Sequence, residues 1–425
     1  MIKLYKMNEV KREEIFARAE NEMDVSGIVR DIIANVVKNG DAALREYTLR
    51  FDKAELTDLQ VSEAEIEEAF SLVDPSFIEI LKKAERNITR FHEKQVRQSF
   101  VINDEDGVVM GQKVMPIEKV GIYVPAGTAP LSSTVLMDAV PARIAGCREI
   151  VMVTPPDQSG KVNPAMLAAA KVAGVNKIFK IGGAQAVAAL AYGTESVPQV
   201  DKIVGPGNAF VAEAKRQVFG RVAIDMIAGP SDILIVSDGK TSPARLAADM
   251  LSQAEHDKLA SAVLVTDSLE TALKVQQQIE LQLEQLPRKD IARVSIENNG
   301  KIIVTDDLPA AIDVSNEIAP EHLELCVDDP FALLSRVRNA GSIFMGRNCP
   351  EALGDYMAGP NHTLPTNGTA RFSSPLSVDD FVKKSQFTYF TKNALDRLSA
   401  DVAAFARMEC LEAHARSAES RDWQE

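Results

Sequence analysis

Hydrophobic and polar positions follow two different patterns along the chain. Residues 8–100 place apolar positions at helical spacing, interrupted only at Pro75, and this pattern predicts helices. From residue 120 onward, short apolar runs alternate with Ala-rich helical stretches. The runs are VGIYV at 120, EIVMV at 149, KIFKI at 177, DILIV at 232, AVLVT at 262, KIIVT at 301 and SIFM at 342. Strands separated by helices are typical of βαβ units, so the pattern predicts an α/β fold with parallel sheets.

Glycine and proline clusters follow several of the predicted strands. They read VPAGTAP after the run at 120, GGAQA after the run at 177, GPGNAF at 205 and AGPSD at 228. In open α/β sheets, ligands bind at the edge where the strands end. Residues 347–375 form a long irregular segment, which we interpret as a functional loop, and a second helical stretch is expected to run from there to the last residue.

Length, charge and cysteine content narrow the class of protein. A chain of 425 residues exceeds what one core usually supports, so at least two domains are expected. The net charge of -14 argues against nucleic acid or an anionic membrane as a partner. Four widely spaced cysteines without a CxxC pair suit a reducing compartment, and charges interrupt every apolar run before it reaches bilayer length. We therefore expect a soluble cytoplasmic protein.

The segment LSQAEHD, residues 251–257, is the first candidate for chemistry. It follows a helical run, and Gln253 and His256 lie three residues apart, so their side chains share one helix face. Two ligand atoms could converge there on one metal ion. The alternative is a polar helix end, because Gln is a poor metal ligand and no HExxH motif accompanies it.

The segment APEHLELCV offers a carboxylate and an imidazole side by side. Pro320 fixes the backbone just before Glu321 and His322, and an apolar strand follows. An imidazole that titrates near neutrality beside a carboxylate suits proton transfer at the mouth of a strand. A proline-led turn with two solvated side chains explains the same residues equally well.

Two later segments carry further ionisable residues. In the long loop, Asp355 and His362 lie among Gly, Pro and Asn residues that turns alone can explain. In the last helical stretch, Glu409 continues an apolar stripe, and the alternative there is a core stripe that frays into charged residues. On a straight helix His414 would point about 140° away from Glu409. Both could reach one site only if the helix ends or bends near Leu411.

A thiol nucleophile is not indicated. Cys147 and Cys326 adjoin or lie in predicted strands, as core cysteines commonly do, and no cysteine stands next to a histidine in the sequence. A GxGxxG motif is also absent, although GGAQAVAA and GPGNAF could hold a phosphate through backbone N–H groups. The residues alone indicate a metal-dependent α/β enzyme.

Several long segments together resemble the histidinol dehydrogenase family. They are VGIYVPAGTAPLSSTVLM, IGGAQAVAALAYGTESVPQVDKIVGPGNAF, DMIAGPSDILI, LSQAEH, APEHLEL, LGDYMAGPNHTLPT and EAHARS, in this order over nearly the whole chain. The resemblance implies a cytoplasmic homodimer, dependent on NAD and on one Zn²⁺ per subunit, that oxidises L-histidinol through L-histidinaldehyde to L-histidine with two NAD. These are the last two steps of histidine biosynthesis.

The resemblance also implies a domain organisation. Two Rossmann-like lobes are expected, with terminal helical segments exchanged between the two subunits. Residues 1–22 would be the N-terminal helical segment, and residues 376–425 would be the C-terminal dimerisation segment. Residues 23–122 together with 232–375 would form the lobe on the zinc and substrate side, and residues 123–231 would form the lobe on the NAD side.

Roles for individual residues follow from the same resemblance. Zinc ligands would be Gln253, His256, Asp355 and, from the partner chain, His414. Glu321 and His322 would be the acid/base pair: His322 takes the hydroxyl proton, and Glu321 activates the water that attacks the aldehyde. The implied substrate contacts are Ser231, Gln253, His256, His322, Asp355, Glu409 and His414, and the implied NAD contacts are Tyr123, Gln185 and Asn208. His362 receives no role.

Two alternative functions stay open on the sequence. One is a homologous zinc- and NAD-dependent dehydrogenase that oxidises another polar primary alcohol to its carboxylate, although Glu409 suits a cationic or imidazole-bearing substrate. The other is a zinc hydrolase in which Glu321 would activate water without any nicotinamide.

Overall fold

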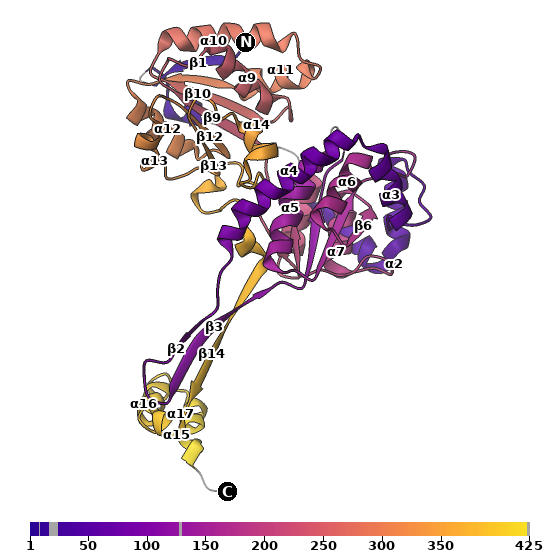
Figure 1. Ribbon diagram of the computed structural model, residues 1–425. Helices are drawn as coiled ribbons and strands as arrows, with labels where there is room; N and C mark the ends of the chain where they lie inside the picture. The colour runs from indigo at the N-terminus through magenta and orange to yellow at the C-terminus, as the bar shows by residue number, and fades with distance from the viewer. Residues whose placement is uncertain (8, 17–23, 127–129, 423–425) are drawn as a thin grey trace. The chain divides into compact units, whose positions relative to one another are not determined.

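The computed structural model describes residues 1–7, 9–16, 24–126 and 130–422. The chain divides into two compact units (Figure 1). The first unit comprises Met1–Gln95 and Ile117–Phe381, and the second comprises Val96–Pro116 and Val382–Glu425. Among the described residues, no helix is both long enough and apolar enough to cross a membrane.

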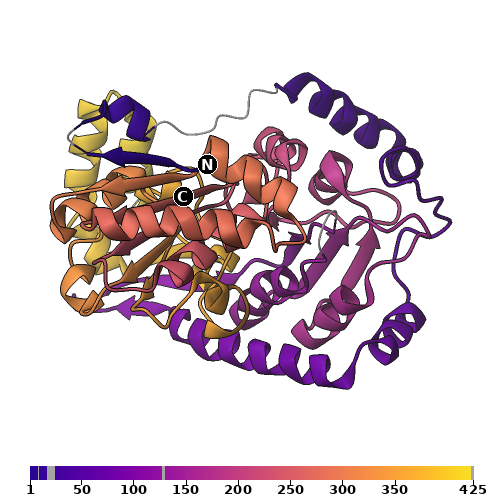
Figure 2. The same ribbon diagram turned by 90° about the horizontal axis from the view of Figure 1, so that it is seen from above.

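The first unit contains a six-stranded sheet in which every neighbouring pair is parallel. Its order is β1-β11-β10-β9-β12-β13. The strands are β1 (Lys3–Lys6), β9 (Asp232–Ser237), β10 (Ser261–Thr266), β11 (Lys301–Val304), β12 (His322–Cys326) and β13 (Ser342–Met345). In Figure 2 the indigo β1 runs beside the orange strands of this sheet. Helices cover both faces: α9 (Pro243–Ala254), α10 (Leu269–Leu283) and α11 (Lys289–Asn298) on one, α1 (Arg12–Phe16), α12 (Leu308–Ile318) and α13 (Pro330–Leu334) on the other.

A five-stranded parallel sheet forms the other half of the same unit, in the order β6-β5-β4-β7-β8. Its strands are β4 (Lys119–Tyr123), β5 (Glu149–Thr154), β6 (Lys177–Lys180), β7 (Lys202–Val204) and β8 (Ala223–Ile224). One face packs against α2 (Ser26–Asp52), α7 (Gly183–Tyr192) and α8 (Ala209–Val218). The other face packs against α3 (Glu63–Leu72), α4 (Pro75–His92), α5 (Ser132–Ala145) and α6 (Pro164–Ala173).

The two sheets share one connectivity. Apart from the edge strand β1, each sheet starts at a central strand, adds two strands on one side, and then returns to add two strands on the other side. The reversal falls between β9 and β12 in the first sheet and between β4 and β7 in the second. This is the order 3-2-1-4-5 of the doubly wound sheets that bind dinucleotides, and such sheets bind ligands in the crevice at the reversal. The predicted α/β fold with parallel sheets is confirmed, as are all seven strands predicted from apolar runs.

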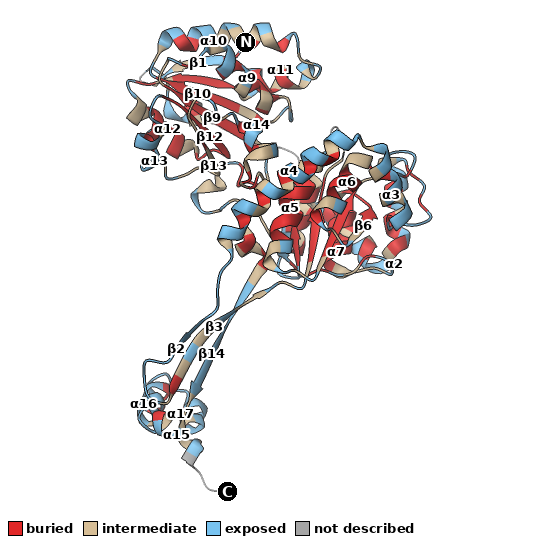
Figure 3. Cartoon of the chain, viewed as in Figure 1, coloured by how far each residue is buried: buried red, intermediate tan, exposed pale blue. Residues whose placement is uncertain are grey.

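Residues 26–92 pack on the five-stranded sheet, where their buried side chains share a core with β4, β5 and β6. The domain division drawn from the sequence grouped residues 23–122 with the six-stranded sheet instead. The apolar faces of α2, α3 and α4 show that these helices cover a sheet, but they do not specify which one. Figure 3 shows the buried residues concentrated in the two sheets and on the inner faces of their helices.

The second unit contains an antiparallel sheet, and the helical prediction was wrong for residues 382–390 but is confirmed for the three helices that follow them. Strand β3 (Val108–Pro116) pairs with β2 (Phe100–Ile102) and, along its whole length, with β14 (Val382–Phe390). Helices α15 (Lys392–Asp396), α16 (Ser399–Met408) and α17 (Glu412–Glu419) follow. Most of β14 is exposed, so its sequence lacks the apolar alternation that marks a half-buried strand.

The N-terminal segment also departs from the helical prediction. Residues 3–6 form an edge strand rather than a helix, paired in parallel with β11. Residues 17–23 lie outside the described residues. The remaining short elements are η1 (Glu93–Gln95), α14 (Glu351–Leu353), the π-helical turn η2 (Gly354–Ala358), η3 (Thr369–Arg371), η4 (Val378–Phe381) and η5 (Ser420–Asp422).

Candidate active site

The candidate acid/base pair lies at the amino edge of the six-stranded sheet. Glu321 immediately precedes β12, and His322 is the first residue of that strand. Helix α9 returns from the carboxyl end of β9 to this edge, because a crossover helix runs antiparallel to the strands that it connects. Its last turn therefore brings Gln253, with His256 just beyond it, to the edge where β12 begins.

At the carboxyl edge, the reversal point of the same sheet is occupied by a charged network. Arg347 Nη2 lies 2.7 Å from Asp238 Oδ2 and 2.6 Å from Asp328 Oδ1, and Nη1 lies 2.6 Å from Thr241 Oγ1. These bonds join the two segments that follow β9 and β12. The candidate acid/base pair therefore lies at the edge opposite to the one where ligands were expected from the sequence.

Three side chains that can ligate a metal ion meet at the amino edge. Ligand atoms of His256, Glu351 and Asp355 all lie within 4.8 Å of one another. Gln253 is 1% exposed, and neither its amide nitrogen nor its oxygen has a hydrogen-bond partner among the described residues. A buried amide without partners is costly unless another group binds it. This donor set, with nitrogen and carboxylate ligands and a buried carbonyl oxygen, fits a zinc ion.

The backbone of β9 orients the imidazole of His322. His322 is 4% exposed, and its Nδ1 donates a hydrogen bond of 3.0 Å to the carbonyl oxygen of Asp232. The proton on Nδ1 leaves Nε2 as the basic nitrogen. Nε2 is buried without a hydrogen-bond partner in the described part of the chain, and it lies 3.9 Å from Glu351 Oε1. When the imidazole is neutral, Nε2 is thus the one atom at which His322 can accept a proton.

Burial and neighbouring charges shift the pKa values of the pair. Burial raises the pKa of Glu321 to about 8, although the charge of His322 opposes that shift. Burial disfavours the protonated imidazole of His322, but the carboxylates of Glu321, Glu351 and Asp355 outweigh it and raise its pKa to about 9. Perturbed ionisable groups that converge in one place are typical of active sites.

His362, to which the sequence gave no role, lies in the site. It lines a cavity of about 110 Å³ together with His322 and Asp355. Its Nδ1 is 3.6 Å from Asp355 Oδ1, and its Nε2 is 3.2 Å from Thr134 Oγ1. Burial opposes ionisation of Asp355, yet the contact with His362 keeps the pKa of this carboxyl below its usual range. His362 therefore holds Asp355 in the charged form that a metal ligand requires.

Glu351 is the second member of the site that sequence reasoning missed. It is 2% exposed and belongs to the same ligand cluster as His256 and Asp355. A signal was present, because Glu351 and Asp355 are four residues apart, a spacing that makes side chains neighbours on a helix.

The predicted NAD contacts lie at the carboxyl edge of the five-stranded sheet. Tyr123 ends β4, Gln185 lies in the first turn of α7, and Asn208 caps α8 just after β7. Tyr123 and Asn208 thus flank the reversal between β4 and β7. The phenol oxygen of Tyr123 accepts a hydrogen bond of 3.0 Å from Gly183 N–H, and burial raises the Tyr123 pKa to about 12. Tyr123 therefore orders the loop that opens α7.

The remaining candidates are spread over both units. Ser231 is partly buried directly before β9, and its carbonyl accepts a hydrogen bond from Ser261 N–H. Glu409 and His414 belong to the second unit, where both side chains are exposed. Helix α16 ends at Met408 and α17 begins at Glu412. The predicted helix end near Leu411 is therefore confirmed, and the 140° offset of a straight helix does not apply.

The cysteines do not form a nucleophilic centre. Cys147, Cys326, Cys349 and Cys410 are all free. Burial raises the pKa of the Cys147 thiol to about 12 and raises that of Cys326 further. Both thiols therefore stay protonated and unreactive near neutral pH.

The doubly wound topology of both sheets, combined with a buried carboxylate–imidazole pair, is typical of an α/β oxidoreductase of two lobes. The sequence model of the histidinol dehydrogenase family matches residues 16–422. The histidinol dehydrogenases of Syntrophotalea carbinolica and Geobacter sulfurreducens are each 56% identical to this chain, covering 96% of it and 95% and 96% of themselves. The chain belongs to the histidinol dehydrogenase family.

A solved structure agrees with this assignment over the full length. The crystal structure of histidinol dehydrogenase from Elizabethkingia anophelis superposes with a TM-score of 0.93 at 40% identity. The match covers 99% of this chain and 98% of that one. The fold described above is therefore that of the family.

Proposed function

We propose that this chain oxidises L-histidinol through L-histidinaldehyde to L-histidine, with two NAD and one water consumed per histidinol, in the last two steps of histidine biosynthesis. The observation that supports this proposal most strongly lies at the amino edge of the six-stranded sheet. There a buried carboxylate–imidazole pair adjoins a cluster of metal-ligating side chains that includes an unpartnered buried amide. Membership in the family supports the same function.

Gln253, His256 and Asp355 would hold the zinc ion, together with His414 of a second subunit. Bound there, zinc would act as a Lewis acid that fixes the nitrogen atoms of the substrate. The described residues already favour this arrangement, because Asp355 is held charged by His362 and Gln253 has no competing partner in the described part of the chain. Ser231 lies directly before β9, next to Asp232, and would add a polar contact to substrate.

His322 and Glu321 would divide the proton transfers. Nε2 of His322 would take the hydroxyl proton as hydride leaves the carbinol carbon for the nicotinamide. Glu321 would remove a proton from the water that attacks the aldehyde, and the resulting hydrate would lose a second hydride to the second NAD. The route requires no cysteine thiolate, in accord with the raised thiol pKa values.

Tyr123, Gln185 and Asn208 would contact NAD at the reversal point of the five-stranded sheet. The N-termini of α7 and α8 open at this edge, and the backbone N–H groups of a helix N-terminus favour phosphate groups. Glu409 would face the imidazole or ammonium group of the substrate across a subunit interface.

The second unit supports the proposal of a homodimer. Among its described residues, the buried apolar cluster consists of Ala403, Ala406 and Ala415. Larger apolar side chains are exposed, including Tyr389 at 60%, Phe405 at 70% and Met408 at 86%. Exposed apolar groups of this size commonly mark an interface with another chain. A second copy would cover them and place its Glu409 and His414 at the active site of its neighbour.

Counting NADH tests the function against its alternatives. Purified zinc-loaded protein is mixed with limiting L-histidinol and excess NAD, and NADH and histidine are quantified. We expect two NADH and one histidine per histidinol. No NADH above background with confirmed zinc occupancy would refute the proposal. Turnover of another primary alcohol in preference to histidinol would favour the related dehydrogenase, and water-dependent cleavage of an ester or amide substrate without NADH would favour the hydrolase.

A further inference from the structure

Asp232 is bonded to both members of the catalytic pair. Its backbone N–H donates to Glu321 Oε2 at 2.9 Å, and its side-chain Oδ1 accepts from Glu321 N–H at 2.8 Å. Its carbonyl oxygen accepts from His322 Nδ1 at 3.0 Å. One residue thus fixes the backbone and carboxylate of Glu321 as well as the ring of His322.

The strand register explains how one residue reaches both. Strands β9 and β12 are parallel neighbours in which His322 pairs with Ile233, so Asp232 lies opposite Glu321 where the two strands begin. At this point Glu321 N–H is bonded to the Asp232 side chain rather than to a backbone carbonyl. The carboxylate of Glu321 in turn accepts a hydrogen bond from the backbone N–H of Asp232. The pair resembles the reciprocal capping box of a helix, but here it closes the edge of a sheet.

We propose that Asp232 is a positioning residue for the proposed reaction: its side-chain oxygen holds Glu321 in register with β9, and this fixed register also keeps the ring of His322 on the Asp232 carbonyl. It acts through the placement of its acceptor atom rather than through its charge. The inference rests on the proposed function, because only there do Glu321 and His322 transfer protons. An active-site group displaced by about 1 Å commonly costs orders of magnitude in rate.

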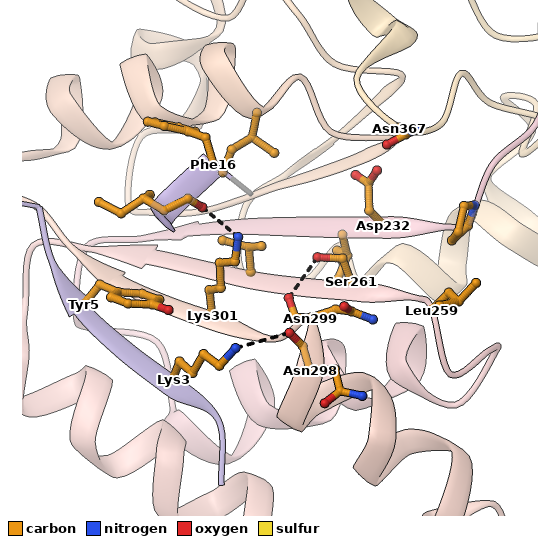
Figure 4. Close-up of a pocket in the computed structure, with 15 residues that line it drawn as sticks. Lys3, Tyr5, Phe16, Asp232, Leu259, Ser261, Asn298, Asn299, Lys301 and Asn367 are labelled. Atoms are coloured by element: carbon orange, nitrogen blue, oxygen red, sulfur yellow. Dashed lines mark hydrogen bonds between the residues drawn. The ribbon is translucent and has the colours of Figure 1, made fainter. Parts of the chain in front are cut away.

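Two conservative substitutions distinguish the position of the Asp232 acceptor oxygen from the charge of its carboxylate. Asp232→Asn keeps an acceptor oxygen at the same place and removes the charge, whereas Asp232→Glu keeps the charge and moves the acceptor by one methylene. Asp232 also lines a cavity of about 180 Å³, with Ser261 and Asn299 nearby (Figure 4). The cavity leaves room for the longer side chain, so both variants should fold.

Steady-state kinetics give the first readout. We expect kcat for histidinol oxidation within about threefold of wild type for Asp232→Asn and reduced at least about tenfold for Asp232→Glu, with KM and zinc content unchanged in both. Asp238→Glu is the matched control, because Asp238 directly follows the other end of β9 and also accepts from a backbone N–H, that of Asp328. It should leave kcat unchanged. An unaffected Asp232→Glu, or an Asp232→Asn that loses as much as Asp232→Glu, would overturn the inference.

Nuclear magnetic resonance gives a readout that does not depend on the substrate. The chain has only five histidines, so ¹⁵N-histidine labelling with His322→Asn as reference assigns the Nδ1 proton of His322. This proton should be protected from exchange in wild type and Asp232→Asn and should lose protection in Asp232→Glu. Equal protection in all three proteins would refute the positioning role even if histidinol were not the substrate, whereas an inactive wild type with the expected pattern would refute only the proposed function.

Discussion

His322 and Glu321 have different environments although they are adjacent in sequence. The imidazole has one nitrogen bonded to the Asp232 carbonyl and the other buried without a partner among the described residues. The carboxylate accepts a backbone N–H, and burial raises its pKa. A fixed imidazole suits proton exchange with the substrate oxygen, and a carboxylate of raised pKa suits removal of a proton from water.

Substitutions should separate the two oxidations. We expect His322→Asn to slow the oxidation of histidinol, with zinc retained, because the basic Nε2 is lost. Glu321→Gln should chiefly slow the oxidation of histidinaldehyde, by roughly 10² or more if proton transfer limits that step. Separate assays with histidinol and with histidinaldehyde measure the two steps. A wild-type rate of aldehyde oxidation in Glu321→Gln would contradict the assigned role.

The sequence alone indicated site residues only where two residues of functional type lie close together in the chain. Gln253 and His256 stand three residues apart, and Glu321 and His322 are adjacent. The structure brings His256 and Asp355 together across about a hundred residues. Asp232 looked like an ordinary residue at the start of a strand, because its importance depends on the register between β9 and β12, which no local pattern encodes.

Among the elements, strands buried on both faces were predictable and exposed ones were not. Strands β9 and β10 are continuous apolar runs because helices cover both sides of their sheet. Strand β14 is exposed along most of its length, and β1 is a four-residue edge strand, so neither carries a distinctive apolar pattern. The break between α16 and α17 was predictable, because Glu409 and His414 could share a site only if the helix ended between them.

The carboxyl end of α2 offers a test of stability against pH. Burial raises the pKa of Asp52, the last residue of this helix, to about 6, and its Oδ2 has no hydrogen-bond partner among the described residues. A carboxylate also opposes the dipole at a helix C-terminus. The folded state therefore binds the proton more tightly than the unfolded state, and this group destabilises the fold increasingly as the pH rises from about 4 to about 6.

We expect Asp52→Asn to stabilise the protein by about 1 to 2 kcal/mol at pH 7, after allowing for solvent screening of a partly exposed carboxylate. The gain should be much smaller near pH 4, where the folded wild type holds the proton and the unfolded chain holds it about half of the time. Urea unfolding between pH 4 and 7.5 measures it. Asp31→Asn, at an exposed position of the same helix, is the control. A gain that did not change with pH would contradict the burial argument.

At the scale of the whole molecule, the two units differ in how they can be stabilised. The first has extensive buried clusters on both faces of two sheets. The second has a cluster of three alanines and leaves large apolar side chains exposed. So small a core contributes little to the free energy of folding. We infer that association with another chain supplies the remaining stabilisation of this unit. The proposed exchange of Glu409 and His414 follows from the same need.

Mixed dimers test whether the active sites are shared. Gln253→Ala removes a proposed zinc ligand from the first unit and His414→Ala removes one from the second. Two differently tagged chains, each with one substitution, are coexpressed, and mixed dimers are purified through both tags. If His414 acts in the neighbouring subunit, one site of each mixed dimer is intact, and roughly half of the wild-type activity should return.

The control pairs a chain carrying both substitutions with a wild-type chain. Here shared sites predict almost no activity, because each site lacks one ligand, whereas unshared sites predict about half. The opposite pattern, an inactive first pairing and a half-active control, would show that each subunit completes its own site.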